Sequence, residues 1–233
     1  MKITNKMQTA MDLLTAEFAF RFNRDRFANC DLDVYKYDDQ DYTVLGLSCK
    51  EFYKLVGAKP AKGANSTALV FKNAVIKWET NAGDSFHRTS DAKSAERLFR
   101  TVEKQKSHLL PNISETMVID RFVIQERVKP TEDWASVPED LRITVAKSII
   151  DVAVELGLGD LHTSNWGFRP SDKRRKTAVV FDFSDQSAFG HWTDPKDVVD
   201  AVGVNTWDEL FTDSDVWELE DYAERKLNFF PNV

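Results

Sequence analysis

The amino-acid sequence predicts an α+β fold, with an antiparallel sheet in the first half of the chain and helices in the second. Residues 67–71 and 74–78 are apolar, partly β-branched runs separated by two residues, which is typical of a β-hairpin. Residues 116–120 and 121–127 predict two further adjacent strands. The near-continuous apolar character of residues 139–156 predicts a buried helix, which ends at the glycines that follow it. Ser136 and Glu139 have the spacing of a capping box at its start.

The length of 233 residues is enough for one sizeable domain or two small lobes. We expect an N-terminal extension at 1–47, a sheet-containing lobe at 48–128 and a helical lobe at 129–233. The sequence has neither an apolar run that could cross a membrane nor a signal-type segment, so we expect a cytoplasmic protein without membrane contact. The net charge of −7 argues against direct nucleic-acid binding.

Two helix signals precede the first predicted hairpin. Residues 4–22 predict an amphipathic helix. Its apolar face carries Met7, Met11, Leu14, Phe18 and Phe22. Further along, Ser48 and Glu51 have the spacing of a capping box and predict the start of a short helix. This helix competes with a first strand at Phe52–Val56, and the pattern alone leaves both readings open.

A single lysine, Lys77, lies inside the apolar strand at 74–78. A charged side chain within such a strand is costly unless it is paired. The helix predicted at about 91–107 supplies two candidate partners. We take Glu96, in the middle of this helix, as the first choice, and Glu103 as the alternative.

Two backbone segments are candidates for nucleotide contacts. Residues 57–66, which include Gly57, Gly63 and Ser66, form a glycine-containing cationic turn whose backbone amides could approach phosphates. A plain surface loop would have the same composition. Glu126 and Val128 lie in a short connection after the fourth strand, where backbone groups could hydrogen-bond a purine ring.

The strongest functional signal is a loop that follows the long helix. Asp160 and Asn165 lie five residues apart in it, and Asp182 ends an apolar strand further on. Mg²⁺ prefers oxygen ligands, so Asn165 and Asp182 are the candidate metal ligands. Asp160 is then free to accept or orient the proton of an attacking hydroxyl, with His162 two residues away facing the transferred phosphate. Each acid alone is typical of a turn or a cap, but their joint order indicates phosphoryl transfer.

The order of these residues resembles the protein-kinase-like superfamily. The resemblance rests on the glycine turn, on Lys77 and Glu96, and on the segments Asp160-Leu161-His162-Thr163-Ser164-Asn165 and Asp182-Phe183-Ser184. The Asp-x-His-x-x-Asn form is similar to aminoglycoside and choline phosphotransferases and to the early serine/threonine kinases of T7-like bacteriophages. The latter resemblance implies a two-lobed fold with a nucleotide-binding sheet lobe and a reduced catalytic helical lobe. It also implies ATP and Mg²⁺ as cofactors, and host proteins as substrates, with transcription or RNA-processing machinery as candidates.

The sequence departs from the family pattern at two positions. Leu158 stands where these families usually place a structural histidine, and Ser184 replaces the glycine after Asp182-Phe183. Only 51 residues follow Asp182, which is short for the helical substrate lobe of a full protein kinase. Three alternatives therefore stay open: a kinase of small-molecule alcohols or amines, a nucleotidyl transferase, and an inactive kinase-like protein that blocks a host factor.

The inactive alternative draws on the acidic C-terminal region. Residues 194–226 contain eleven acids against three bases, a local net charge of −8. Such runs are most often solvated helix faces, and a minority are docking surfaces for basic partners. We expect three short helices here, capped by Asp194, Asn205 and Ser214. A basic run at 173–176 predicts an exposed hairpin turn.

Overall fold

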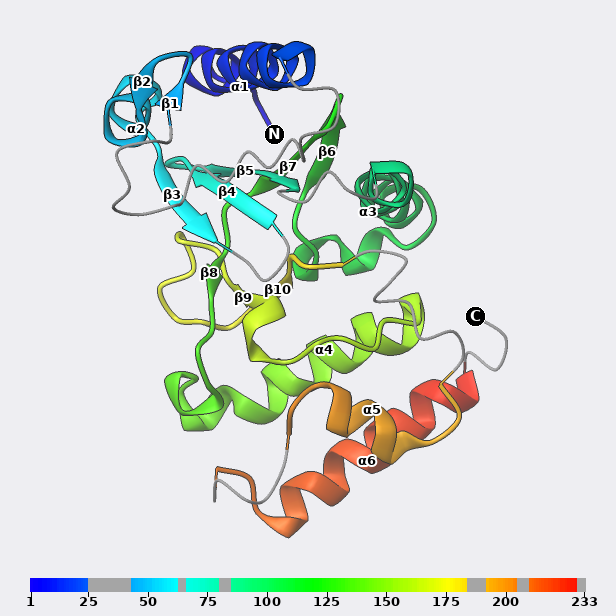
Figure 1. The fold of residues 1–233 in the computed structure, drawn as a ribbon. Coiled ribbons are helices and arrows are strands. Elements are labelled where there is room, and N and C mark those ends of the chain that lie inside the picture. Colours follow the sequence, from blue (N-terminus) through cyan, green and yellow to red (C-terminus); the bar gives the residue numbers. More distant parts are fainter. Residues whose placement is uncertain (25–42, 63–65, 80–84, 184–191, 205–209, 230–233) are drawn as a thin grey trace. The chain divides into compact units, whose positions relative to one another are not determined.

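The computed structural model describes residues 1–24, 43–62, 66–79, 85–183, 192–204 and 210–229 (Figure 1). It shows a mixed α+β chain with a five-stranded antiparallel sheet. The chain divides into two compact units. The first unit holds residues 1–96 and 116–127, and the second holds residues 97–115 and 128–233.

The sheet of the first unit has the strand order β3-β4-β5-β7-β6. The strands span Lys59–Lys62 (β3), Ser66–Val70 (β4), Ala74–Glu79 (β5), Thr116–Ile119 (β6) and Phe122–Glu126 (β7). Both predicted strand pairs are confirmed: β4 pairs with β5 and β6 pairs with β7, each antiparallel. The turn between β4 and β5 is closed by Phe71 N, which donates to Ala74 O at 2.8 Å.

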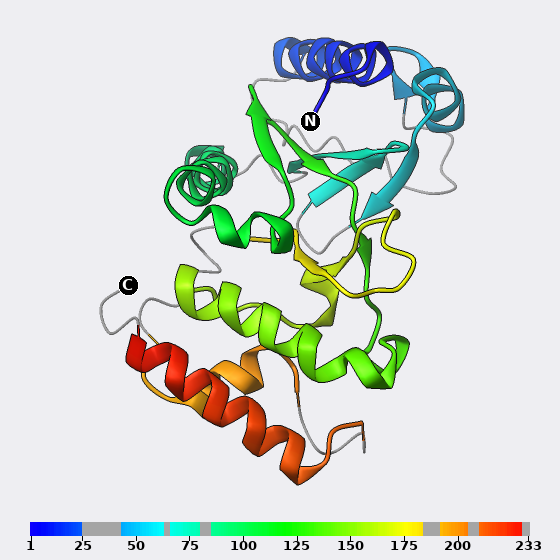
Figure 2. The same ribbon diagram turned by 180° about the vertical axis from the view of Figure 1, so that it is seen from behind.

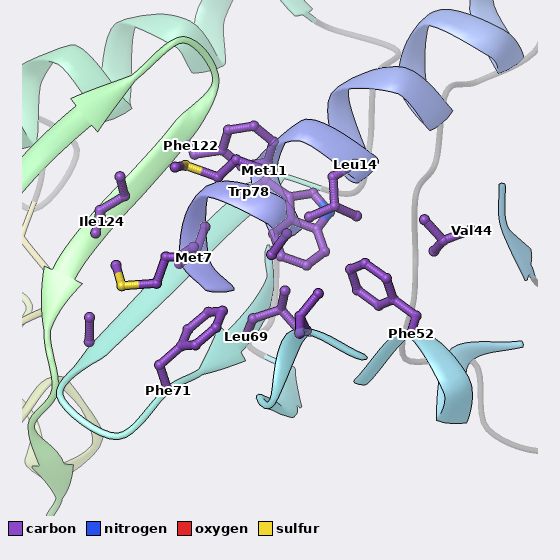
Figure 3. Close-up of a cluster of buried hydrophobic side chains, with 14 of the residues drawn as sticks. Met7, Met11, Leu14, Val44, Phe52, Leu69, Phe71, Trp78, Phe122 and Ile124 are labelled. Carbon is purple, nitrogen blue, oxygen red and sulfur yellow. The ribbon is translucent and has the colours of Figure 1, made fainter. Parts of the chain in front are cut away.

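Helix α1 (Asn5–Arg24) belongs to the core of the first unit. Its predicted apolar face is buried at Met7, Met11, Leu14 and Phe18, while the side chain of Phe22 lies outside the described part. Figure 3 shows this face meeting large side chains from β4, β5 and α2. Burial of this apolar surface supplies the main driving force for folding of the unit.

The open question at residues 49–56 is answered by a helix, α2 (Cys49–Val56). The predicted capping box forms: Glu51 N donates to Ser48 Oγ at 3.4 Å, and Ser48 N donates to Glu51 Oε2 at 2.9 Å. Each bond satisfies a backbone donor at the helix start, so the strand reading of 52–56 was wrong. A short hairpin, β1 (Thr43–Val44) with β2 (Leu47–Ser48), leads into this helix.

In the second unit, helix α4 (Arg142–Leu156) packs against a three-stranded sheet of order β10-β9-β8. The strands are Lys129–Pro130 (β8), Trp166–Phe168 (β9) and Ala178–Val180 (β10). Strands β9 and β10 form an antiparallel hairpin, and the basic run at 173–176 lies in its turn as predicted. Helix α3 (Ser85–Gln105) and a 3₁₀ segment (Ser107–Asn112) connect β5 to β6.

The start of α4 differs from the prediction. Residues 139–141 form a 3₁₀ turn rather than the first turn of the α-helix, and the capping box predicted at Ser136 does not form. Ser136 N instead donates to Asp133 Oδ1 at 2.8 Å, which closes a separate 3₁₀ segment at Trp134–Ser136. The carboxylate of Asp133 thereby binds the amide that Glu139 would bind in a capping box.

The C-terminal region contains α5 (Pro195–Ala201) and one long helix, α6 (Asp213–Phe229), which lie beside α4 (Figure 2). The cap at Asp194 is confirmed, since Lys196 N donates to its Oδ1 at 2.9 Å. The cap at Ser214 was wrong, because Thr212 Oγ1 accepts from Asp215 N at 3.2 Å and α6 starts two residues earlier than a Ser214 cap would start it. Asn205 lies outside the described residues.

Across the described ranges, no helix is both long enough and apolar enough to span a bilayer.

Candidate functional site

The loop with the predicted catalytic residues is held by the end of α4. Gly157 ends the helix in the left-handed conformation with φ 65°, which a glycine adopts without strain. Leu158 N donates to Ala153 O at 3.0 Å, and the Leu158 side chain is fully buried. The side chain of Leu158 therefore serves as an apolar anchor for the loop. Leu161 is also fully buried, so the side chains of Leu158 and Leu161 both anchor the loop in the core of the second unit.

Asn165 connects this loop to the end of β10. Its Nδ2 donates to Asp160 O at 3.0 Å, and its N donates to His162 O at 2.9 Å. Its own carbonyl oxygen accepts from Phe181 N at 3.1 Å and from Asp182 N at 3.3 Å. The backbones of Asp160, Asn165 and Asp182 are therefore gathered in one hydrogen-bonded cluster, although 22 positions separate the first from the last.

The side chains of this cluster differ in exposure. Asn165 is buried, with 7% of its surface exposed, whereas the Asp160 and His162 side chains are 59% and 57% exposed. Asp182 is exposed, and Phe183 beside it is buried and anchors the strand end. The amide of Asn165 is thus buried, whereas the carboxylates of Asp160 and Asp182 are accessible to solvent.

The side chains of Asp160, His162 and Ser164 contact one another in this loop. His162 Nε2 lies 3.1 Å from Asp160 Oδ1, and His162 Nδ1 lies 2.6 Å from Ser164 Oγ. Asn165 Nδ2 is 3.4 Å from the same His162 Nε2. The sequence predicted roles for Asp160 and His162 but missed Ser164. The sequence signal for Ser164 was its position: a hydroxyl two residues after His162 is within reach of the ring nitrogen Nδ1.

The chemistry of Asn165 and Asp182 fits a hard cation. Because Nδ2 of Asn165 is committed to Asp160 O, its Oδ1 is the atom that remains for a metal. Within the described ranges, no group of three or more His, Cys, Asp or Glu side chains could hold a metal. Two protein oxygens suffice for Mg²⁺ when substrate phosphates and water complete its shell.

In the first unit, Lys77 lies near the centre of the sheet. Its neighbours Ile76 and Trp78 on β5 point into the core with α1, so Lys77 lies on the opposite sheet face. Its register partners are Ala68 on β4 and Val123 on β7, and Val118 on β6 completes the row.

Glu96 lies at the end of this same row. Val118 N donates to Glu96 Oε1 at 3.3 Å, so α3 contacts the edge strand through this carboxylate. The alternative partner, Glu103, pairs with Arg100 of its own helix at 2.9 Å. The Lys77–Glu96 ion pair stays a prediction. Lys77 lies in the same cross-strand row as Val118, and Glu96 contacts Val118 from α3 at the edge of the sheet.

The predicted phosphate loop is divided among several elements. Gly57 is the left-handed C-cap of α2 with φ 68°, and its N–H donates to Tyr53 O at 2.9 Å. This N–H is thus used by the helix, at an end whose partial charge is negative. Gly63 lies outside the described residues, and Ser66 is the first residue of β4.

The predicted purine-binding segment begins inside a strand. Glu126 is the last residue of β7 and pairs with Ala74, and Val128 is buried before β8. Between them, Arg127 N donates to Asn73 O at 3.1 Å. Gln125 is also buried, and its Nε2 donates to Thr116 Oγ1 at 3.1 Å. The pairing of Glu126 with Ala74 and the hydrogen bond from Arg127 N to Asn73 O hold the end of β7 against β5.

Comparison with known proteins gave no relatives: the chain matches no protein-family model and no curated protein sequence.

Proposed function

We propose that this protein is an ATP- and Mg²⁺-dependent phosphotransferase, a small serine/threonine protein kinase of the phage type that acts on host proteins. The observation that carries this proposal is the double acceptance by Asn165 O, which draws Asp182 N to the loop of Asp160. This backbone contact supports a site in which a carboxylate, an amide and a second carboxylate act in the order that phosphoryl transfer requires.

In this proposal each residue has one role. Asp160 orients the acceptor hydroxyl and takes its proton, with His162 next to its carboxylate. Asn165 and Asp182 hold Mg²⁺, which neutralises charge on the β- and γ-phosphate oxygens when bound. Lys77 holds the α- and β-phosphates, and Glu96 orients Lys77.

The topology of the first unit supports the nucleotide-binding role. Its strand order is β3-β4-β5-β7-β6. Counted along the chain within this sheet, Lys77 lies on the third strand, β5, and α3 lies between β5 and the fourth strand, β6. Protein kinases likewise place their lysine on the third strand and its glutamate on the helix that follows. In chain order, the predicted glycine-containing segment at 57–66 comes before the strand that carries Lys77, where protein kinases have their phosphate-covering loop.

Mass spectrometry of the intact protein tests this function. After incubation with Mg-ATP and a bacterial lysate, we expect phosphate on lysate proteins or on the chain itself. Asp182→Ala should lower transfer by at least about a thousandfold, because the metal loses a charged ligand. Asp197→Ala, an exposed acid on α5, is the matched control and should transfer normally.

Equal transfer by wild type and Asp182→Ala would contradict the proposed role of this residue. A mass increase equal to one AMP, instead of one phosphate, would identify nucleotidyl transfer. Transfer to small alcohols or amines, with none to protein, would instead place the enzyme among the small-molecule kinases.

One observation favours a second candidate function, a binding protein that blocks a host factor. Trp217 on the acidic helix α6 is 71% exposed, which is unusual for so large an apolar side chain. Asp213, Glu220 and Glu224 lie along the helix at spacings that place them near it. A chain that neither binds Mg-ATP nor transfers phosphate would favour this second function.

A further inference from the structure

The turn between β9 and β10 carries four consecutive basic residues that the proposed function does not use. They are Lys173, Arg174, Arg175 and Lys176, in a chain whose net charge is −7. A run of like charges on a turn is most often a solvated surface. The contacts within this turn, however, give the four cations different tasks.

Asp172, the acid next to this run, uses its carboxylate on the backbone of the turn. Its Oδ1 accepts from Arg174 N at 3.2 Å, and its Oδ2 accepts from Lys176 N and Thr177 N, each at 2.9 Å. Its own N–H donates to Arg169 O at 2.9 Å. Asp172 therefore fixes the backbone of the turn, and among the described residues it forms no ion pair with the cations beside it.

Arg175 is also used within the second unit. Its Nη1 donates to Ser136 O, and its Cζ lies 5.9 Å from the centre of the Phe168 ring. Its side chain is half-buried, and its backbone φ is 53°, which is uncommon for a residue other than glycine. The guanidinium of Arg175 therefore holds the turn in place.

The other three cations point their charge outward. The side chains of Lys173, Arg174 and Lys176 are exposed, and within the part of the chain that the structure describes none of them has an ion-pair partner. Because the backbone beneath them is fixed, little chain entropy is lost when they bind a ligand. An acidic ligand also relieves the repulsion among the three like charges.

The hairpin relates this turn to the candidate metal ligands. Asn165 comes directly before β9 and Asp182 follows soon after β10, so both lie at one end of the hairpin and the basic turn lies at the other. A strand rises about 3.3 Å per residue, which places the turn at least about 10 Å along β9 from Asn165. An extended peptide needs about three or more residues to cover this distance.

We propose that the β9–β10 turn is a docking surface for an acidic segment of the protein substrate, several residues away from the hydroxyl that accepts the phosphate. The identity of the occupant as a substrate rests on the proposed function, whereas binding of an acidic segment does not. A short acidic segment suits this turn better than a nucleic acid, because the net charge of −7 repels a long polyanion.

Fluorescence anisotropy of the full chain with a labelled octapeptide of Asp and Glu tests the docking surface directly. We expect binding that weakens as the salt concentration rises. Lys173→Gln/Arg174→Gln/Lys176→Gln should lower the affinity at least about tenfold, since three surface ion pairs are lost together. The charge-preserving variant Lys173→Arg/Arg174→Lys/Lys176→Arg should bind the peptide as wild type does.

A second triple variant separates the charge of the turn from the net charge of the chain. Lys50→Gln/Lys54→Gln/Lys72→Gln removes the same number of charges from exposed positions of the first unit. It should bind the acidic peptide as wild type does. An equal loss of affinity in both triple variants would show attraction to the overall charge and would overturn the proposal.

Peptide phosphorylation connects the turn to substrate choice. Two synthetic peptides carry one serine and, about six residues away, a run of either Glu or Gln, spaced to reach the turn. Wild type should show a KM at least about tenfold lower for the Glu peptide with an unchanged kcat, because the turn lies away from the reacting atoms. The triple Gln variant of the turn should lose this difference.

Equal binding of the acidic peptide by wild type and the turn variant would overturn the docking surface, as would equal KM values for the two peptides. Tighter binding of an RNA or DNA oligonucleotide, lost in the turn variant, would instead identify a nucleic-acid site. A dimer that dissociates in the turn variant would show that a second copy covers the turn. Binding of the acidic peptide without transfer to any peptide or protein would contradict the proposed function and leave the docking surface in place.

Discussion

Gly167 holds β8 and β9 close together, directly after the loop that carries Asp160 and Asn165. A side chain at this position would place its Cβ 2.0 Å from Lys129 O and 2.9 Å from Pro130 Cα. Both neighbours are backbone atoms, so they cannot move aside as a flexible side chain would. The position therefore requires glycine for space rather than for an unusual φ.

We expect Gly167→Ala to lower the free energy of unfolding of the second unit by about 3 kcal/mol through overpacking. Hydrogen exchange at Thr131 N, which donates to Trp166 O, would measure the loss. Gly46→Ala is the control, because no atom lies within 4 Å of its Cβ position and only its φ of 81° is strained. A Gly167→Ala protein as stable as Gly46→Ala would contradict this explanation.

At the residue scale, sequence prediction succeeded where the relevant contacts are local. Asp160, His162 and Asn165 lie within six consecutive residues, so their spacing alone placed them together. Asp182 was predictable because it follows a short apolar strand, β10, which ends two residues earlier at Val180. The N–H of Gly57 was not predictable as a helix cap, because glycine fits a phosphate loop and a C-cap equally well.

Helix α2 is an element whose start depends on pH. The hydrogen bonds from the Ser48 hydroxyl at 2.7 Å, and then from its N–H, lower the pKa of the Glu51 carboxyl below its ordinary value of 4.5. A depressed pKa in the folded state stabilises the helix above the unfolded pKa, and this contribution is lost as the pH falls through the folded pKa.

We therefore expect the Ser48 amide to lose its protection from exchange as the pH falls below about 4.5, in step with protonation of Glu51. Amide exchange followed by NMR across this range would measure the change. In Glu51→Gln the protection should vary no more than at a reference amide of the β4–β5 turn. Protection that stays constant through the protonation of Glu51 would show that this carboxylate does not cap α2.

At the element scale, the hairpins were predictable because a short turn and apolar runs specify them locally. The helix starts were less so. Asp133 accepts from the Ser136 amide, and Thr212 rather than Ser214 caps α6, because several polar residues near each start compete to bind the free backbone amides. The length of α6 depends on its ties to α4: Tyr222 Oη donates to Asp151 at 2.8 Å, and Lys226 pairs with it at 2.7 Å. Hydrophobic periodicity in the sequence does not predict these two polar contacts.

At the scale of the whole molecule, each unit contributes a different part of the proposed enzyme. The first supplies the sheet with Lys77, and the second supplies the loop with Asp160, Asn165 and Asp182. The sequence predicted this assignment through the order of the motifs. It did not predict that α1 belongs to the core of the first unit, because an amphipathic helix does not specify which surface it covers.

The most direct test of the proposed metal site replaces Mg²⁺ by paramagnetic Mn²⁺ in a complex with ATP. We expect the amide signals of Asn165, Phe181 and Asp182 to broaden first, and Asp182→Ala to weaken this broadening strongly, because the proposed ligands Asn165 and Asp182 are joined through the Asn165 carbonyl. Broadening confined to the acidic helix α6, with the Asn165 and Asp182 signals unchanged, would contradict the proposed site.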